Sequence, residues 1–315
     1  MENINLHTLL DKEAIAFLVN FQHVAKRLGR ESYVVGGVVR DMFLRNPLTD
    51  FDLMLSVDAI SFVKELKQRW MTEFGSYPEP KRFDAFKKYG TCKLFFESPL
   101  FLQVDQLDFS TARSETYPQP GGKPEIVFGT LLQDMQRRDF SVNAMAICLH
   151  EDANCSLFDP FHGKSHLEKK ELHVLHEKSF EDDPARLLRA VRFMVRFDFT
   201  LSAKTEKLFK SAIESNAFEM LPKQRAFDEF RKLLMERSAY QMLEKLKELG
   251  LLKQIINAPV KLSSEISARQ DKGSWKDVLS NLLESLSQDE KVTWCSERGV
   301  SKEVTEELLC PQKSP

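Results

Sequence analysis

The stretch YVVGGVVRDMFLRNPLTDFDLML (residues 33–55) carries the strongest structural signal in the chain. Residues 33–35 form a β-branched and aromatic run that leads into a glycine pair, Gly36-Gly37. A helical pattern covers residues 39–44, and residues 50–55 return to a strand pattern. The stretch therefore predicts a strand, a glycine turn, a helix and a second strand, which together begin a unit that mixes helices with a sheet.

Two aspartates, Asp50 and Asp52, stand one residue apart in the second of these strands. Side chains alternate faces along a strand, so both carboxylates are expected on one face. Carboxylates held that close repel each other unless a cation lies between them, and their oxygens suit Mg²⁺ that carries substrate phosphates. Gly36 and Gly37 open a helix whose free backbone N–H groups offer a site for a phosphate. The alternative is that Asp-Phe-Asp is a solvated turn.

Length and composition limit the classes of protein to consider. The chain has 315 residues, enough for two or more compact units, with 29% charged and 42% hydrophobic residues. Its net charge of −2 argues against a protein that coats nucleic acid nonspecifically. The five cysteines show no CxxC spacing, no apolar run approaches the length of a membrane span, and the N-terminus lacks the pattern of a signal peptide. We therefore expect a cytoplasmic protein with no membrane partner.

Strand and helix patterns alternate through the first 150 residues, whereas helical patterns fill the chain after Pro160. The first part predicts helices over 8–29, 39–44 and 59–70, strands over 33–35, 50–55, 91–96 and 101–108, a loop rich in proline and glycine over 115–124, and a helix followed by a strand or buried segment over 131–149. The second part predicts helices over 183–197, 203–216, 223–236 and 240–249 and no further strand. The fold class is thus a mixed α/β unit followed by an all-helical part, overall α+β and mostly helical.

Two later clusters combine charges in unusual ways. The run Arg137-Arg138-Asp139 through Asn143 sets arginine forks, which suit phosphate oxygens, beside groups that suit ribose hydroxyls; a solvated helix end with a salt bridge is the alternative. The run over 182–193 begins with Asp182-Asp183-Pro184, which fits a capped first helical turn. Four arginines then share one third of the helix surface with no acid among them: Arg186, Arg189, Arg192 and Arg196. They would repel each other unless they met anions, and a solvated cationic face is the alternative.

The segments GGVVRD…DFD, DFSTARSETY, RRDFSVNAMAI, DPFHGK, DDPARLLRAVRF and QRAFDEFRKLL follow one another in this order. Over roughly residues 31–250, this ordered set resembles the class II tRNA nucleotidyltransferases, the family of CCA-adding enzymes and bacterial poly(A) polymerases. The resemblance implies a nucleotidyltransferase catalytic head over 1–150, a neck with a base-reading helix over 151–200, and a helical body with a reduced tail over 201–315.

The same resemblance implies an activity and its partners. The enzyme would add CMP and AMP to tRNA 3′ ends without a template, releasing pyrophosphate, with CTP, ATP and two Mg²⁺ ions and no implied protein partner. Asp50 and Asp52 would bind the metal ions, and Asp108 would be the third catalytic acid, with Asp105 as its rival. A CC-adding or A-adding specialist, a poly(A) polymerase and a noncatalytic RNA-binding relative are the alternatives.

The resemblance also assigns the nucleotide-binding residues. Asp183 would accept a hydrogen bond from the exocyclic amino group of C or A, and Arg186 would donate to the adjacent ring nitrogen. Uracil and guanine present a keto oxygen where that amino group should be, so they would be rejected. The other expected nucleotide-binding residues are Gly36, Gly37 and Arg40 at the triphosphate, Arg138 near the phosphates, Asp139 at the ribose, and Arg189 and Arg192. Asn143, at the same turn as Asp139, is expected either to bind the nucleotide or to buttress the turn.

Some segments depart from the family pattern or fit more than one reading. Asp182 replaces the usual glutamate and is expected to hold Arg186 less tightly, Gln224 stands where the family often has glutamate, and little matches after Leu252. Residues 81–89 lie where the family has a flexible loop; their alternating aromatic and basic side chains suit either a nucleic-acid contact or an element that covers the core. Four histidines have ligand-like spacing but are expected to be surface residues: His162, His166, His173 and His176.

Overall fold

The computed structural model describes residues 2–149, 154–258, 260, 262 and 274–309, and the chain divides into two compact units. The first unit comprises Met1–Thr116, Glu125–Lys169 and His173–Leu175. The second comprises Tyr117–Pro124, Lys170–Leu172 and His176–Pro315. No helix among the described residues is long and apolar enough to cross a membrane.

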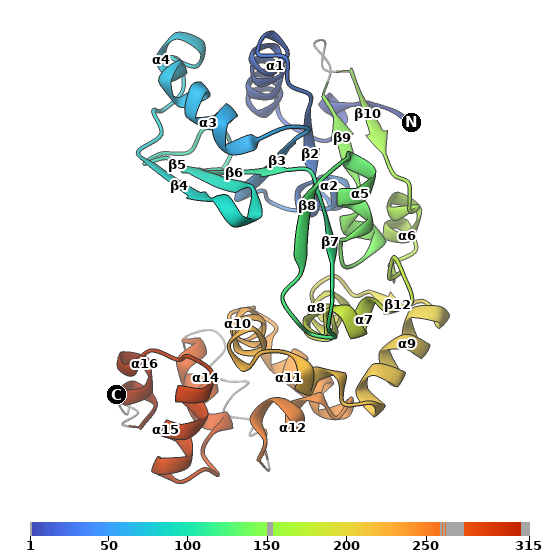
Figure 1. Ribbon diagram of the computed structural model, residues 1–315, viewed down its shortest axis with the longest axis vertical. Coiled ribbons are helices and arrows are strands. Elements are labelled where there is room, and N and C mark those ends of the chain that lie inside the picture. The colour runs from blue at the N-terminus through green and yellow to red at the C-terminus, as the bar shows by residue number, and fades with distance from the viewer. Residues whose placement is uncertain (1, 150–153, 259, 261, 263–273, 310–315) are drawn as a thin grey trace. The chain divides into compact units, whose positions relative to one another are not determined.

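The first unit is built on a mixed sheet (Figure 1). Among the described residues, eight strands form this sheet in the order β1 (Glu2–Asn5), β10 (Asn154–Phe158), β9 (Ala146–Cys148), β2 (Ser32–Val35), β3 (Asp50–Leu55), β6 (Gln106–Thr111), β5 (Thr91–Phe95) and β4 (Arg82–Phe86). Strands β3 and β6 run parallel, whereas the other described neighbours in the sheet are antiparallel. The sheet confirms the α/β class that the sequence predicts for this part of the chain.

One face of the sheet carries the main hydrophobic core. The side chains of Phe51, Leu53 and Phe109 are buried and belong to the same cluster as the apolar faces of α1 (Lys12–Arg27) and α3 (Ala59–Gln68). Helix α1 begins cleanly because the carboxylate of Asp11 accepts a hydrogen bond of 2.7 Å from Ala14 N. Since side chains alternate along a strand, the residues between these apolar positions project from the opposite face of the sheet.

That opposite face is covered only in part. A smaller cluster of buried side chains lies there: Val35, Met54, Ala112, Met135, Ala144 and Ala146. It includes residues of α5 (Leu131–Gln136) and of the segment that follows the short 3₁₀ turn η3 (Ser141–Asn143). Helix α2 (Gly37–Leu44) directly follows β2. The polar residues of β3 and β6 share this face with the smaller cluster.

The second unit is mainly helical. Its described helices are α7 (Ser179–Asp182), α8 (Ala185–Arg196), α9 (Ala203–Glu214), α10 (Lys223–Leu234), α11 (Ala239–Glu248), α12 (Leu251–Ile256), α14 (Trp275–Leu282), α15 (Gln288–Glu297) and α16 (Lys302–Leu309). Helix α8 packs against both α10 and α11. The fold class predicted from the sequence, with a largely helical part after the mixed sheet, is confirmed.

The structure differs from the sequence predictions in three strand assignments. Residues 115–124 are not all loop, because β7 (Arg113–Thr116) and β8 (Glu125–Phe128) form an antiparallel hairpin. The strand expected to begin at residue 101 begins instead at Gln106. A two-residue parallel pair, β11 (Glu171–Leu172) and β12 (Thr200–Leu201), occurs where no strand was expected. Local composition gives no direct information about the pairing of β11 with β12, because its hydrogen bonds join Glu171 and Leu172 to residues far along the chain, Thr200 and Leu201.

Candidate functional site

Two carboxylates lie next to each other on the partly covered face of the sheet. Asp52 on β3 and Asp108 on β6 are direct partners in the parallel register, so both side chains project from the same face. Both residues are half-buried. On the next strand, Lys93 is the register partner of Asp108, and its Nζ lies 2.6 Å from Asp108 Oδ2. Asp52, Asp108 and Lys93 therefore form a row across three adjacent strands.

The register also separates the two candidates for the third acid. Asp105 is exposed and precedes β6, and its backbone oxygen accepts a hydrogen bond of 2.9 Å from Phe96 N. Asp50 is the first residue of β3 and pairs with Gln106, but its side chain lies outside the described part of the structure. Among the side chains that are described, no group of three or more His, Cys, Asp or Glu is arranged to hold a metal ion. The metal-binding roles of Asp50 and Asp52 stay predictions.

The glycine turn after β2 brings the first and second sequence clusters together. Gly36 has φ of 73°, and a Cβ atom built on it would lie 2.4 Å from Arg138 Nη1. A side chain at this position would thus both strain the backbone and displace the arginine. Gly37 begins α2, and a Cβ there would make only ordinary contact with the side chain of Arg40. Arg138 also donates to Asn143 O at 3.2 Å, and Gly36 N donates to Met145 O at 3.1 Å, which ties the glycine turn to the segment after α5.

A buried acid holds both arginines of the second cluster. Asp134 is fully buried on α5; its Oδ2 accepts from Arg137 Nη2 at 2.8 Å, and its Oδ1 accepts from Arg138 Nη2 at 2.9 Å. Burial alone raises the pKa of Asp134, but the two guanidinium groups outweigh burial and hold that pKa below its usual value. Asp134 was not predicted from the sequence, although its spacing of three and four residues from the arginines is a recognisable helical signal.

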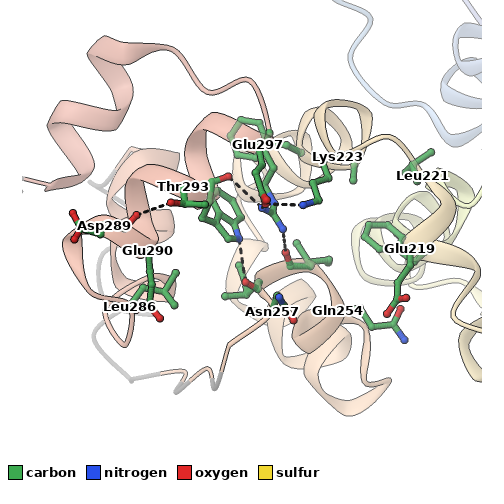
Figure 2. A pocket seen from close by; sticks show the side chains of 17 residues that line it. Glu219, Leu221, Lys223, Gln254, Asn257, Leu286, Asp289, Glu290, Thr293 and Glu297 are labelled. Atoms are coloured by element: carbon green, nitrogen blue, oxygen red, sulfur yellow. Dashed lines mark hydrogen bonds and ion pairs between the residues drawn. The ribbon is translucent and has the colours of Figure 1, made fainter.

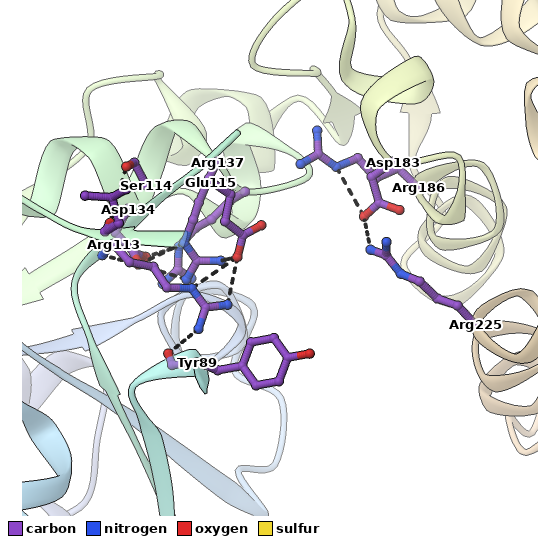
Figure 3. Close-up of polar contacts among 11 residues, drawn as sticks. Tyr89, Arg113, Ser114, Glu115, Asp134, Arg137, Asp183, Arg186 and Arg225 are labelled. Atoms are coloured by element: carbon purple, nitrogen blue, oxygen red, sulfur yellow. Dashed lines mark hydrogen bonds and ion pairs between the residues drawn. The ribbon is translucent and has the colours of Figure 1, made fainter. Parts of the chain in front are cut away.

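A second acid from the hairpin joins this network (Figure 3). Glu115 Oε1 lies 3.0 Å from Arg137 Nη1 and 2.7 Å from Arg113 Nη2. Arg113 also donates to the backbone oxygen of Tyr89. The arginines are thus held in defined positions by two acids, which explains how several cations coexist in one small region. The salt bridges of the alternative, a solvated helix end with a salt bridge, are present at the end of α5, but the acid that makes them is buried.

Three residues of the predicted nucleotide site form a buried chain of hydrogen bonds. Asn143 Oδ1 accepts from Arg40 Nη1 at 2.6 Å, and Asn143 Nδ2 donates to Asp139 Oδ1 at 2.9 Å. Arg40, Asp139 and Asn143 are each buried. Asn143 therefore bridges α2 and the turn after α5, which matches the buttressing role considered for it. Nucleotide contacts by Arg40 and Asp139 stay predictions.

In the second unit, Asp183 is bound by two arginines (Figure 3). Its Oδ2 lies 2.8 Å from Arg225 Nη2 on α10 and 3.9 Å from Arg186 Nε on α8. Its Oδ1 accepts from Ala185 N at 3.2 Å and so helps to begin α8, although the N-cap residue itself is Pro184. Asp183 and Arg186 are both buried, and the sequence pair predicted to read the base is thus held in one place.

The structure corrects the prediction for the arginine face of α8. The sequence shows no acid within this stretch, but Glu236, which follows α10, lies 2.6 Å from Arg192 Nε and 3.2 Å from Arg196 Nη1. Arg186 is buried, so it does not belong to a solvated cationic face. Repulsion along this helix is therefore relieved partly by a residue forty positions away, not only by outside anions. Nucleotide binding by Arg189 and Arg192 stays a prediction.

The aromatic and basic segment over 81–89 covers the core in part, and its contact with nucleic acid stays a prediction. It forms the edge strand β4 and a 3₁₀ turn, η2 (Lys87–Tyr89). Phe83 packs against the main core, whereas Phe86 is 46% exposed and Tyr89 is 41% exposed. Lys88 Nζ lies 5.7 Å from the ring centre of Tyr89. The segment thus covers the core with one aromatic ring and presents two others to solvent beside positive charge.

A cavity of about 690 Å³ lies in the helical second unit (Figure 2). Its charged lining residues are Glu219, Asp289, Glu290, Glu297, Lys223 and Arg298. The acids outnumber the bases, so this cavity is unsuited to a triphosphate. None of the residues predicted for catalysis or nucleotide binding lines it. The cavity is therefore not the candidate site, despite its size.

Two family models match the chain, one described as the poly A polymerase head domain over residues 32–173 and one as a probable RNA and SrmB-binding site of polymerase A over 198–260. A curated A-adding tRNA nucleotidyltransferase of Aquifex aeolicus (strain VF5) is 38% identical over 225 residues, which cover 71% of this chain and 26% of that protein. The apo form II of a CCA-adding enzyme superposes with a TM-score of 0.79 at 26% identity, over 98% of this chain and 74% of that one. The chain belongs to the class II tRNA nucleotidyltransferase and poly(A) polymerase family.

The chain is also similar to a second solved structure, a tRNA nucleotidyltransferase in complex with a primer tRNA and an incoming ATP analog. It is 29% identical with a TM-score of 0.71, over 92% of this chain and 82% of that one. The chain spans only 26% to 57% of the length of the curated A-adding relatives that it matches.

The Asp134→Asn variant tests the buried network in this family member. The variant keeps the side-chain shape but removes the buried negative charge that Arg137 and Arg138 share, which we expect to destabilise the first unit by about 3 kcal/mol or more at neutral pH. Because the pKa of Asp134 is lowered in the folded protein, its stabilisation is fully present above the unfolded pKa and is lost as the pH falls through the folded pKa.

Urea denaturation at neutral and acidic pH measures both effects. The difference between wild type and Asp134→Asn should shrink as the pH falls below about 4. The control is Glu79→Gln, which changes an exposed carboxylate in the same unit and should leave stability within about 0.5 kcal/mol. A neutral-pH difference as small as that of the control would contradict the role given to Asp134.

Proposed function

We propose that the protein is a template-independent tRNA nucleotidyltransferase that adds CMP and AMP to tRNA 3′ ends. The observation that carries the proposal is the register pairing of Asp52 with Asp108 on the polar face of the sheet. The Asp183 and Arg186 pair in the second unit supports a function that includes base selection. The family membership and the relatives named as tRNA nucleotidyltransferases support nucleotidyl transfer to tRNA.

Divalent cations fit the donor set of the head. Asp52 and Asp108, with Asp50 on the same strand, would hold Mg²⁺ through hard carboxylate oxygens. Such ions, when bound, lower the pKa of an attacking hydroxyl and neutralise a triphosphate. Without them, Lys93 at 2.6 Å from Asp108 offsets part of the repulsion between the two carboxylates. Such a pair of carboxylates suits a site that binds cations before nucleotidyl transfer takes place.

The reaction is an in-line displacement at the α-phosphorus of the incoming nucleotide. The 3′-hydroxyl oxygen of the RNA forms a bond to that phosphorus, the bond from phosphorus to the bridging oxygen breaks, and pyrophosphate leaves. The hydroxyl proton passes to solvent. The protein's part is to position and neutralise: Arg138, fixed by Asp134 against Gly36, places a guanidinium at the glycine turn, where a phosphate would meet backbone N–H groups.

Base selection follows from the chemistry of a carboxylate beside a guanidinium. Asp183 can only accept hydrogen bonds and Arg186 can only donate them. C and A present an amino donor to Asp183 and a ring-nitrogen acceptor to Arg186. U and G present a keto oxygen to Asp183 and a ring N–H to Arg186, so neither contact is matched. Arg225 and Ser179 support the pair, since Arg225 Nη2 binds Asp183 and Ser179 Oγ accepts from Arg186 Nη1 at 2.6 Å. A support of this kind makes rejection of the wrong base strong, because a mismatched base leaves buried polar groups unpaired.

The exposed rings of Phe86 and Tyr89 beside Lys88 suit single-stranded RNA. Bases stack on aromatic side chains while cations meet the phosphates, and neither contact requires a particular sequence. We therefore assign this surface of the first unit to the RNA acceptor. The relative solved with a primer tRNA supports RNA as the acceptor.

An A-adding specialist is the second candidate, since the curated relative at 38% identity is named an A-adding enzyme. The decisive experiment offers the protein tRNA transcripts that end at the discriminator base or at CC, with CTP, ATP or both, and sequences the product ends. The proposal predicts complete CCA on the first transcript. Addition of A alone, and only to the CC-ended transcript, would identify the specialist, and long A tails on unrelated RNA would identify a poly(A) polymerase.

Substitution of Asp52 and Asp108, the two carboxylates in the row across the sheet, tests the catalytic assignment. Asp52→Asn and Asp108→Asn should each lower incorporation by more than about a hundredfold while tRNA binding persists, because even groups that only support a metal ligand matter by about 10- to 100-fold. The matched control is Asp105→Asn, which changes the exposed rival three residues from Asp108 and should keep near wild-type turnover. If Asp105→Asn were inactive and Asp108→Asn active, the assignment of the third acid would be wrong.

A further inference from the structure

His176 lies between two charged residues of the second unit. Its Nε2 is 3.3 Å from Arg186 Nη1, and its Nδ1 is 3.8 Å from Asp182 Oδ2. The same Nη1 atom of Arg186 lies 2.6 Å from Ser179 Oγ. The imidazole thus connects Asp182 on α7 with Arg186 on α8.

The chemistry of the two contacts fixes the protonation state of the ring. A guanidinium group has hydrogen-bond donors and no acceptor, so His176 Nε2 must accept and cannot carry a proton. The proton of the neutral ring is therefore on Nδ1, the atom that faces Asp182. A carboxylate beside Nδ1 favours that tautomer. The contact of 3.3 Å with Arg186 Nη1 therefore favours a ring that carries no proton on Nε2.

We propose that neutral His176 is a positioning residue that holds Arg186 in its base-selecting orientation, with Asp182 keeping the ring proton on Nδ1. This inference rests on the proposed function, because it concerns how nucleotides are selected. A protonated ring would have no acceptor on Nε2 and would place a second cation 3.3 Å from Arg186. Selectivity should then fall, while the phosphoryl-transfer chemistry of the first unit is not directly changed.

The sign of the pH effect follows from the surroundings of the ring. Burial lowers the pKa of His176, Arg186 lowers it further, and Asp182 opposes them by raising it, with a net pKa below the ordinary value. Asp182 and Arg186 are the charged groups that act on the ring, and Ser179 is the polar neighbour that shares Arg186. The ring is therefore neutral at neutral pH, and Arg186 loses this support only as the pH falls below about 6.5.

Two substitutions separate positioning from titration. His176→Gln can place a carbonyl oxygen near the position of Nε2 and does not titrate, whereas His176→Lys places a permanent cation beside Arg186. The measured quantity is the ratio of kcat/KM for CTP or ATP to that for UTP, at about pH 7.5 and about pH 4.5, because the pKa of His176 lies below the ordinary histidine value near 6.5. His7→Gln is the control, since His7 is exposed and belongs to the first unit.

In wild type and in the control, selectivity should fall about tenfold or more on acidification, the size expected for loss of a hydrogen bond to a charged group. His176→Gln should keep its selectivity at both pH values, and His176→Lys should be unselective at both. A pH response of His176→Gln equal to that of wild type, or full selectivity in His176→Lys, would overturn the inference.

Nitrogen NMR of the histidine rings gives a readout that does not depend on activity. At neutral pH, the spectrum of wild type should show the Nδ1–H tautomer for His176, and Asp182→Asn should shift the ring toward other states. An Nε2–H ring in wild type would overturn the inference even if the enzyme were fully active. Absence of any nucleotide incorporation by wild type would instead count against the proposed function, so the two failures are distinguishable.

Discussion

Strands β3 and β6 pair in a parallel register that places Asp52 directly beside Asp108 and Phe51 beside Leu107. The first pair projects from the polar face of the sheet, and the second is buried in the main core. A slip of one residue would exchange the faces, moving carboxylates into the core and aromatic rings to the site. Burial of the apolar residues and placement of the carboxylates therefore depend on the same set of backbone hydrogen bonds.

The arginine network extends this order from the sheet to the glycine turn. A single buried carboxylate, Asp134, fixes Arg137 and Arg138, and Arg138 in turn lies against Gly36. Because an unpaired buried charge is costly, the network is stable only when all of its members are present. The same principle applies in the second unit, where Asp183 is bound by Arg225 and approached by Arg186. In both units, a buried acid holds arginine side chains in defined positions.

The sequence predicts local features well and distant partners poorly. The strand, glycine turn, helix and strand over residues 33–55 are confirmed, because each depends on residues within that stretch. The proximity of Asp108 to Asp52 depends on the strand register, which links residues more than fifty positions apart. Glu115 and Glu236 were missed because they meet Arg137 and Arg192 across more than twenty intervening residues. The hairpin of β7 and β8 was missed because proline and glycine dominate its connecting loop.

The central claim is that the first unit performs the transfer and the Asp183 and Arg186 pair of the second selects the base. The most direct measurement is kcat/KM of Asp183→Asn for CTP, ATP, UTP and GTP. An amide can donate to the keto oxygen of U or G as well as accept from the amino group of C or A, so it removes one of the two mismatches, while the ring N–H of U or G still faces Arg186. We predict that this variant still transfers nucleotides and discriminates less strongly against UTP and GTP than wild type does. An active variant that rejects UTP and GTP as wild type does would contradict the account.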